Sequence, residues 1–284
     1  MHFGTGHSER MIVLKSLLDR HFLKTELHFT EKLNTIPEEF LSYDKALIQP
    51  LLILDIRDAD LNSIQNRPAV ILDNRCRNRR QYEKVPGIYF FDSLPYPGCN
   101  LNKVFQSLLI DPKLIELKKT KTLNQKKERK KILLYADDLF PEWLGSALSK
   151  LANGRFSISA AGSSRIIPQF PEIENLGRMD RQSFYNVLLE SDIVFSYFGM
   201  LYFESLYLHK TAVLYTRGTE RSEHGILSEY FSCEMGVPYL KSIQDFLDFD
   251  FNIQPQSPKI KISGYGYKAL QDLILMIRKD TVRS

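Results

Sequence analysis

The sequence predicts an α/β protein made of two Rossmann-like domains, each built on a parallel sheet. Short continuous apolar runs recur along the chain with helix-periodic stretches between them, which is typical of parallel strands joined by helical crossovers. This alternation stops at a polar, basic segment and then starts again. At 284 residues the chain also exceeds the size at which one hydrophobic core usually stops growing, so two domains are expected.

Composition narrows the class of protein without identifying it. Apolar residues make up 43% and aromatic residues 12% of the chain, enough to fill two cores. No apolar run reaches the ~20 residues of a membrane span, and no signal peptide is visible, so a cytoplasmic protein is expected. Cys76, Cys99 and Cys233 are far apart without metal-site spacing and are interpreted as reduced thiols. The net charge of +4 suits an anionic ligand, a nucleic acid or a membrane surface equally.

The first half of the chain predicts one helix followed by three buried strands. Apolar residues at helical spacing begin at Met11 and end at Phe22. Strands are predicted over 51–55, 69–73 and 88–92, and each ends in an aspartate. Acids in this position lie at the carboxyl edge of a parallel sheet, where α/β proteins keep their ligands. The alternative is that they cap helices or bond to loops.

A basic segment, KKTKTLNQKKERKK over 118–131, marks the predicted domain boundary. It lacks apolar periodicity, which favours a solvated linker. Clustered Lys and Arg also suit nucleic acid or anionic lipid, but the segment has no aromatic residue for stacking. We therefore expect an N-terminal domain over 1–120 and a C-terminal domain over 121–284.

The second half predicts a second parallel sheet. Its strands and helices alternate at lengths that require right-handed crossovers. The expected strands are 132–136, 156–159, 192–196 and 211–215, and the expected helices are 141–151, 180–190, 199–208 and a closing helix over 267–277.

The first candidate motif is Gly4-Thr5-Gly6-His7 with Arg10 one turn further on, at the start of the first helix. A Gly-x-Gly segment that opens a helix lets a phosphate approach backbone N–H groups. His7 there could take a proton from water or a sugar hydroxyl, and the helix dipole favours its neutral form. The alternative is a histidine that only caps the helix, and Arg10 could equally be a solvated helix residue.

The second candidate motif is Ser196-Tyr197-Phe198-Gly199, a strand end and glycine turn, with Glu204 on the second turn of the helix that follows. Such a turn lets a pyrophosphate approach the helix N-terminus, and a carboxylate one turn on can accept both ribose hydroxyls. Glu204 could instead be a surface helix residue.

Together these motifs resemble the nucleotide-sugar hydrolases of the pseudaminic acid pathway and their spore-coat polysaccharide relatives, which have the two-domain glycosyltransferase-B fold. The resemblance implies that His7 is the general base that activates water and that Gly4, Gly6 and Arg10 are the matching motif positions. It also implies a phosphate turn at Gly199, an acceptor or catalytic role for the domain over 1–120, and nucleotide-sugar binding by the domain over 121–284.

The same resemblance assigns further binding positions. It makes Glu204 the ribose ligand. It places Arg178 in a loop that meets the nucleobase, with an exposed loop cation as the alternative. His224 would lie near the phosphates or the sugar, with helix capping as the alternative. Asp55 would hold sugar hydroxyls or a catalytic water, or else form a local ion pair with Arg57.

The sequence departs from the family pattern in three places. The family has a strand before the glycines, whereas only three residues precede Gly4 here, so the first strand of the N-terminal domain is absent from the predicted fold. Met200 and Leu201 occupy positions that usually carry hydroxyls. The first strand of the second domain ends in Ala136-Asp137-Asp138 instead of a Gly-rich loop, and two acids there repel a pyrophosphate unless a cation intervenes.

The function predicted from these residues is hydrolysis of a UDP-sugar, with water activated by His7, in bacterial surface-polysaccharide or nonulosonic acid biosynthesis. A glycosyltransferase with the same donor and a non-catalytic nucleotide-sugar-binding protein are the alternatives. The expected partner is the UDP-sugar, bound in the cleft between the domains. No metal, cofactor or nucleic acid is expected, peripheral membrane contact is not indicated, and a monomer is expected.

Overall fold

The computed structural model describes residues 5–19, 51–55, 61–64, 68–72, 78–92, 104–106, 109–120, 129–152, 154–218, 225, 228–230, 232–233, 236–252 and 266–283. The chain forms two compact units, one of residues 1–112 with 262–284 and one of residues 113–261. The sequence-based division cuts the chain once, near residue 120, whereas in the structure the C-terminal segment belongs to the first unit.

The first unit contains a four-stranded parallel sheet in the order β1-β2-β3-β4. Its strands are β1 (Leu52–Leu54), β2 (Ala69–Leu72), β3 (Ile88–Asp92) and β4 (Val104–Gln106). The first three lie within the predicted strands, and β4 was not predicted. The helix α1 (Thr5–Asp19) begins at the first described residue.

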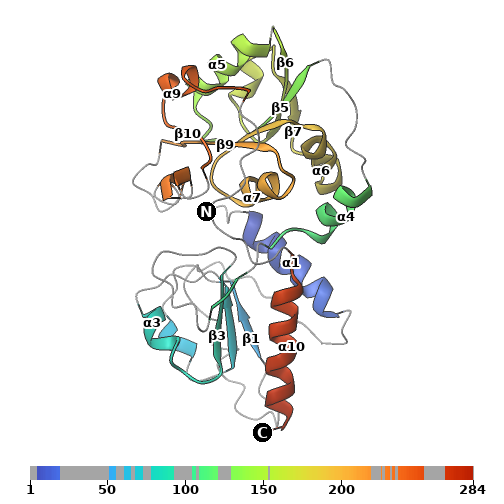
Figure 1. Cartoon of the computed structure of the whole chain (residues 1–284), viewed down its shortest axis with the longest axis vertical. Helices are drawn as coiled ribbons and strands as arrows, with labels where there is room; N and C mark the ends of the chain where they lie inside the picture. Colours follow the sequence, from blue (N-terminus) through green and yellow to red (C-terminus); the bar gives the residue numbers. More distant parts are fainter. Residues whose placement is uncertain are drawn as a thin grey trace. The chain divides into compact units, whose positions relative to one another are not determined.

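Both faces of this sheet are covered, which explains the continuous apolar sequences of its strands. On one face, Val70 and Leu72 pack with residues of α1 and of α10 (Lys268–Arg283). Figure 1 shows where the two helices lie. On the other face, the alternate β2 residues pack with η1 (Leu61–Ile64) and with the segment around α3 (Arg79–Tyr82). The helix predicted to close the chain therefore contributes to the core of the first unit.

The second unit contains a six-stranded parallel sheet in the order β10-β9-β8-β5-β6-β7. Four strands fall where the sequence predicts them: β5 (Lys130–Ala136), β6 (Phe156–Gly162), β8 (Ile193–Ser196) and β9 (Thr211–Tyr215). The edge strands β7 (Glu174–Gly177) and β10 (Tyr239–Leu240) were not predicted. Two parallel sheets in an α/β chain confirm the predicted fold class.

Helices cover this sheet as well. They are α4 (Pro112–Thr120), α5 (Glu142–Ala152), α6 (Arg181–Glu190), α7 (Met200–Tyr207) and α9 (Ile243–Leu247), with a short η2 (Ile167–Gln169). Residues of α5 and α9 share one core with alternate residues of β5, β6, β8 and β9. α6 contacts β5, and α7 contacts β8 and β9.

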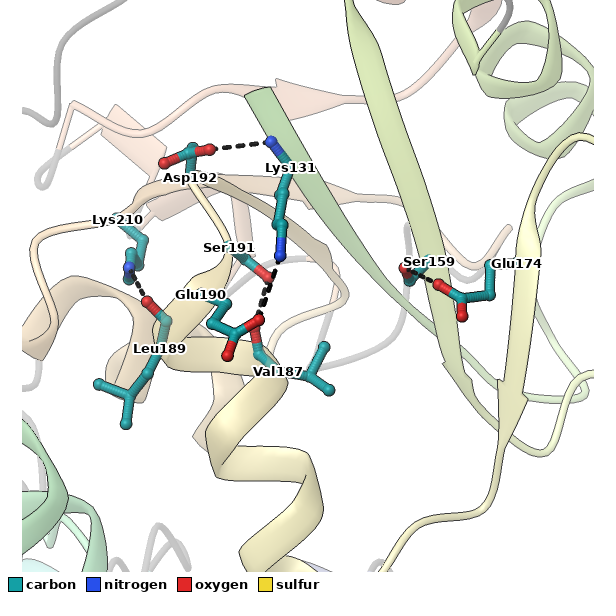
Figure 2. Close-up of polar contacts among 9 residues, drawn as sticks. All are labelled: Lys131, Ser159, Glu174, Val187, Leu189, Glu190, Ser191, Asp192 and Lys210. Carbon is teal, nitrogen blue, oxygen red and sulfur yellow. Dashed lines mark hydrogen bonds and ion pairs between the residues drawn. The ribbon is translucent and has the colours of Figure 1, made fainter. Parts of the chain in front are cut away.

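Polar contacts tie α6 and β8 to the amino end of β5 (Figure 2). The backbone N–H of Lys131 donates to the Asp192 carboxylate at 2.8 Å, and its ammonium donates to Glu190 at 3.1 Å. The buried ammonium of Lys210 donates to the carbonyl oxygen of Leu189 at 2.7 Å, near the C-terminus of α6. A cation in this position satisfies a terminal carbonyl and complements the helix dipole.

The predicted linker is partly built into the second unit. Residues 118–120 belong to α4, 130–131 begin β5, and 121–128 lie outside the described residues. The ammonium of Lys118 donates to the carbonyl oxygen of Tyr207 at 2.6 Å. It also lies 4.2 Å from the centroid of the Tyr207 ring. Burial lowers the pKa of Lys118. Lys118 therefore anchors α4 to the C-terminal end of α7.

Among the described residues, no helix is both long and apolar enough to cross a membrane.

Leu270→Ala should destabilise the first unit selectively. Leu270 is fully buried in the core that α10 shares with α1 and β2, and deleting such a side chain typically costs about 2–5 kcal/mol. In native-state hydrogen exchange, the substitution should speed up amide exchange relative to the wild type in β1–β3, and should change it little in β5, β8 and β9. Met276→Ala, at an exposed position of the same helix, is the matched control and should change little. Equal loss of protection in both units would contradict the assignment of α10.

Candidate functional site

The second sheet has a topological switch point between β5 and β8. From β5 the chain proceeds outward through β6 and β7, then returns to the other side of β5 as β8 and continues through β9 and β10. In open parallel sheets, ligands bind at the carboxyl ends of the strands where the order reverses in this way. The residues at this point are Asp137 after β5 and Tyr197 to Gly199 after β8. The second predicted motif therefore lies where the topology favours a ligand.

Gly199 is the N-cap of α7 and has neither a backbone nor a packing reason to be glycine. Its φ of 171° and ψ of −169° are extended values that any residue adopts. A Cβ built on it would lie 3.8 Å from a ring carbon of Tyr197, which is ordinary van der Waals contact. The missing side chain instead leaves the start of α7 open, where the first N–H groups of a helix have no acceptor within the helix. An anion can approach the backbone closely at such a position.

Glu204 lies on the second turn of α7 and is buried, with 8% of the residue exposed. The Tyr185 hydroxyl, from α6, donates to its Oε1 at 3.0 Å. A buried carboxylate needs hydrogen-bond donors to offset the loss of water, and Tyr185 supplies one. Glu204 is thus not a surface helix residue, and its carboxylate is held in a fixed position.

Arg217, which the sequence analysis did not select, lies at the same switch point. It comes two residues after the end of β9, and its guanidinium is 4.2 Å from the centroid of the Tyr197 ring. Its Nη2 donates to the Asp137 carboxylate, which also accepts the backbone N–H of Leu139 at 3.0 Å. The cation that two acids at this edge require is therefore present. Two features of the sequence could have indicated this pair. Arg217 comes two residues after the predicted strand 211–215, and Asp137 and Asp138 follow the predicted strand 132–136 without a nearby cation.

Tyrosine side chains surround this pair. The Tyr197 ring lies 5.8 Å from that of Tyr135 and 6.3 Å from that of Tyr215. The Tyr215 hydroxyl donates to the carbonyl oxygen of Tyr135 at 2.6 Å. Burial raises the pKa of both Tyr197 and Tyr215, so their phenols remain protonated at neutral pH. Tyr135 and Tyr215 thus hold the Tyr197 ring in place, and that ring provides the aromatic face against which Arg217 stacks.

Arg178, the predicted nucleobase residue, is exposed directly after β7. It lies at the carboxyl edge of the same sheet, but β6 stands between β7 and β5 in the strand order. His224 and Gly4 lie outside the described residues.

The first unit joins two predicted site residues in one ion pair. The Arg10 Nε donates to Asp55 Oδ2 at 2.9 Å, and Nη2 donates to Oδ1. About 5% of each side chain is exposed. Asp55 is thus paired with Arg10 from α1, across 45 residues of sequence, and Arg57 lies outside the described residues. A bidentate pair of this kind fixes α1 against the end of β1.

Gly6 and His7 lie within the first helix. α1 begins at Thr5, between the two glycines of the motif, so both residues belong to its first turn. His7 is therefore at the helix N-terminus, as predicted.

A third arginine, Arg79, is also internal. It makes a bidentate pair with Asp92 at 3.0 and 2.7 Å, donates to Glu83 at 3.0 Å, and lies 4.6 Å from the centroid of the Phe90 ring. Only 9% of its side chain is exposed. Arg79 thus binds the acid at the end of β3 and is engaged within the fold, whereas Arg80 is exposed.

The side chains at the switch point suit an anionic ligand with hydroxyl groups. A helix N-terminus and a guanidinium attract phosphate, and a buried carboxylate accepts hydroxyl protons. Among the described residues, no group of three or more His, Cys, Asp or Glu side chains could hold a metal ion.

Comparisons with known proteins agree at the level of the fold. No protein-family model matches the sequence, and a search of curated proteins gave no match. The structure is similar to that of S. aureus MnaA with UDP, with a TM-score of 0.50 and 15% identity over 94% of this chain and 85% of that chain. The glycosyltransferase-B-like fold that the motifs predict is thereby confirmed.

Two further structures are similar at a lower score. A putative UDP-N-acetylglucosamine 2-epimerase from Listeria monocytogenes has a TM-score of 0.45 and 13% identity over 82% of this chain and 74% of that chain. The Neisseria meningitidis UDP-GlcNAc 2-epimerase bound to UDP-GlcNAc has a TM-score of 0.45 and 17% identity over 70% and 65%. These neighbours are named as epimerases, and none is named as a hydrolase of the pseudaminic acid pathway.

Arg79→Gln should be strongly destabilising. It leaves the buried Asp92 carboxylate without its partner, and breaking a buried pair in this way typically costs about 3–5 kcal/mol. Urea unfolding measures the loss. Arg80→Gln, one position along the same helix and exposed, should change the free energy of unfolding by about 0.5 kcal/mol or less. Equal effects of the two substitutions would show that Arg79 is not a structural residue.

Proposed function

We propose that this protein binds the UDP part of a nucleotide sugar at the switch point of the second unit and processes the attached sugar. The observation that carries the proposal is the β8–Gly199–α7 connection at that point. Its N-cap, Gly199, is a glycine that neither the backbone conformation nor the packing requires. Glu204, five residues further on, supplies a buried carboxylate. The fold shared with the UDP complex of S. aureus MnaA supports the same ligand class.

In this proposal the ligand is held by three kinds of group. Backbone N–H groups at the start of α7 receive the diphosphate, with the positive end of the helix dipole behind them. The Glu204 carboxylate accepts the ribose hydroxyls while Tyr185 holds it in position. Arg178 is proposed to contact the uracil ring, from the exposed end of β7.

The reaction we propose is hydrolysis of the bond between the sugar and the diphosphate, in the synthesis of a bacterial surface polysaccharide or nonulosonic acid. Water attacks the sugar, His7 accepts the proton of that water, and UDP leaves with the bonding electron pair. The assignment of His7 is based on the N-terminal motif and on its place in the first turn of α1. A transferase would replace water with an acceptor hydroxyl, and a binding protein would carry out neither step.

UDP should stabilise the protein, and Glu204→Gln should remove most of that stabilisation. A ligand at about a hundredfold over its Kd stabilises the native state by roughly 2.7 kcal/mol, which appears as a rise in Tm. The glutamine keeps an acceptor for the Tyr185 hydroxyl but loses the charge-assisted bonds to ribose, so UDP binding should weaken by about 10- to 100-fold. Glu116→Gln, at an exposed position of α4, is the control. An unchanged UDP shift in Glu204→Gln would reject the ribose assignment.

His7→Ala should abolish most turnover and leave UDP affinity intact. Loss of a positioned general base typically costs about 10²–10⁴-fold in rate. Products from UDP-sugars should be analysed with and without acceptors: free sugar indicates hydrolysis, acceptor-dependent UDP release indicates transfer, and an isomeric UDP-sugar indicates epimerisation. Binding without any product indicates a binding protein. Wild-type turnover that His7→Ala matches would reject His7 as the base.

A further inference from the structure

Arginine–aspartate pairs occur at three strand ends, and one of them differs from the other two. The pairs made by Arg10 and Arg79 are bidentate, and less than a tenth of each side chain is exposed. Arg217 instead donates to Asp137 through Nη2 alone, with 24% of the arginine side chain and 17% of the aspartate side chain exposed. The first two pairs have the geometry of structural pairs, whereas the third is open to solvent.

The guanidinium of Arg217 is also less completely satisfied. In the described part of the chain, its buried Nε has no hydrogen-bond partner. A buried donor without an acceptor is costly, because it has lost water and gained nothing in return. An arginine presents its donors as a planar fork that matches the oxygens of phosphate. The Nε–H donor of the charged Arg217 guanidinium is thus unused among the residues that the structure describes.

The location of Arg217 connects this donor capacity with the proposed nucleotide site. β9 lies beside β8, and β8 lies beside β5, so the arginine reaches from one strand end to Asp137 across the end of β8. On the way it stacks on Tyr197, two residues before Gly199. The guanidinium therefore lies against the connection that leads from β8 to the start of α7.

We propose that Arg217 is a ligand of the nucleotide's diphosphate, and that a phosphate oxygen replaces the Asp137 carboxylate on its guanidinium. This inference rests on the proposed function and names the residue that provides the cation for it. Asp137 neutralises Arg217 before the ligand binds, and the Tyr197 ring keeps the guanidinium in place during the exchange. The same arrangement explains how a diphosphate is accommodated beside an acid that would otherwise repel it.

The two members of the pair should then have opposite effects on UDP. Arg217→Gln removes the charge-assisted bonds to phosphate and should weaken UDP binding by about 10- to 100-fold. Asp137→Asn removes the competing negative charge and should tighten it. Uridine, which lacks the diphosphate, should bind both variants as it binds the wild type. Calorimetric titration with UDP and uridine, and Tm values without ligand, measure these effects.

Arg155→Gln is the matched control, because it removes an exposed arginine just before β6, at the opposite edge of the same sheet. Its UDP affinity should equal that of the wild type. If the wild type binds UDP and Arg217→Gln binds it equally well, the inference is overturned while the proposed function stands. It is also overturned if both variants lose UDP and uridine binding together with a lower Tm, since the pair is then only structural. A wild type that does not bind UDP overturns the proposed function itself.

Discussion

The parallel pairing of β8 with β5 is the constraint on which the candidate site depends. Ile132 pairs with Ile193 and Leu134 with Phe195, so two segments 61 residues apart end at the same edge of the sheet. The chain leaves β5 toward β6 on one side and leaves β8 toward β9 on the other, so the connections diverge from these two strand ends. The Gly199 turn, the start of α7 and the Arg217–Asp137 pair all lie there as a consequence.

Ion pairs serve two different purposes in this protein. The buried, bidentate pairs of Arg10 and Arg79 join a helix to the carboxyl end of a strand in the first unit. Their charges are fully compensated inside the fold, so little is left for a ligand. The pair at the switch point is only partly buried and has a single hydrogen bond. Burial and bond count, more than residue type, thus distinguish the two structural pairs from the pair that we propose to meet phosphate.

Much of the second unit was predictable because its local signals agree with its tertiary structure. Buried apolar runs became β5, β8 and β9, and Asp180 caps α6 by accepting the N–H of Ser183 at 3.0 Å. β7 was missed because its sequence, Glu-Asn-Leu-Gly, is largely exposed and gives no apolar signal. Pairing across 80 residues, as between Arg217 and Asp137, leaves no local pattern. The helical periodicity of α10 predicted a helix but not which core it would cover.

The short helix α7 has a consequence for how a ligand would be received. Eight residues are too few for a stable isolated helix, so α7 depends on contacts along its length. Tyr185 holds its middle through Glu204, and Lys118 holds its last turn through the Tyr207 carbonyl oxygen. Its leading amides are thereby oriented when the unit folds, before any anion arrives. Binding can then proceed without ordering the backbone, and the entropy of that step is lost during folding and not during recognition.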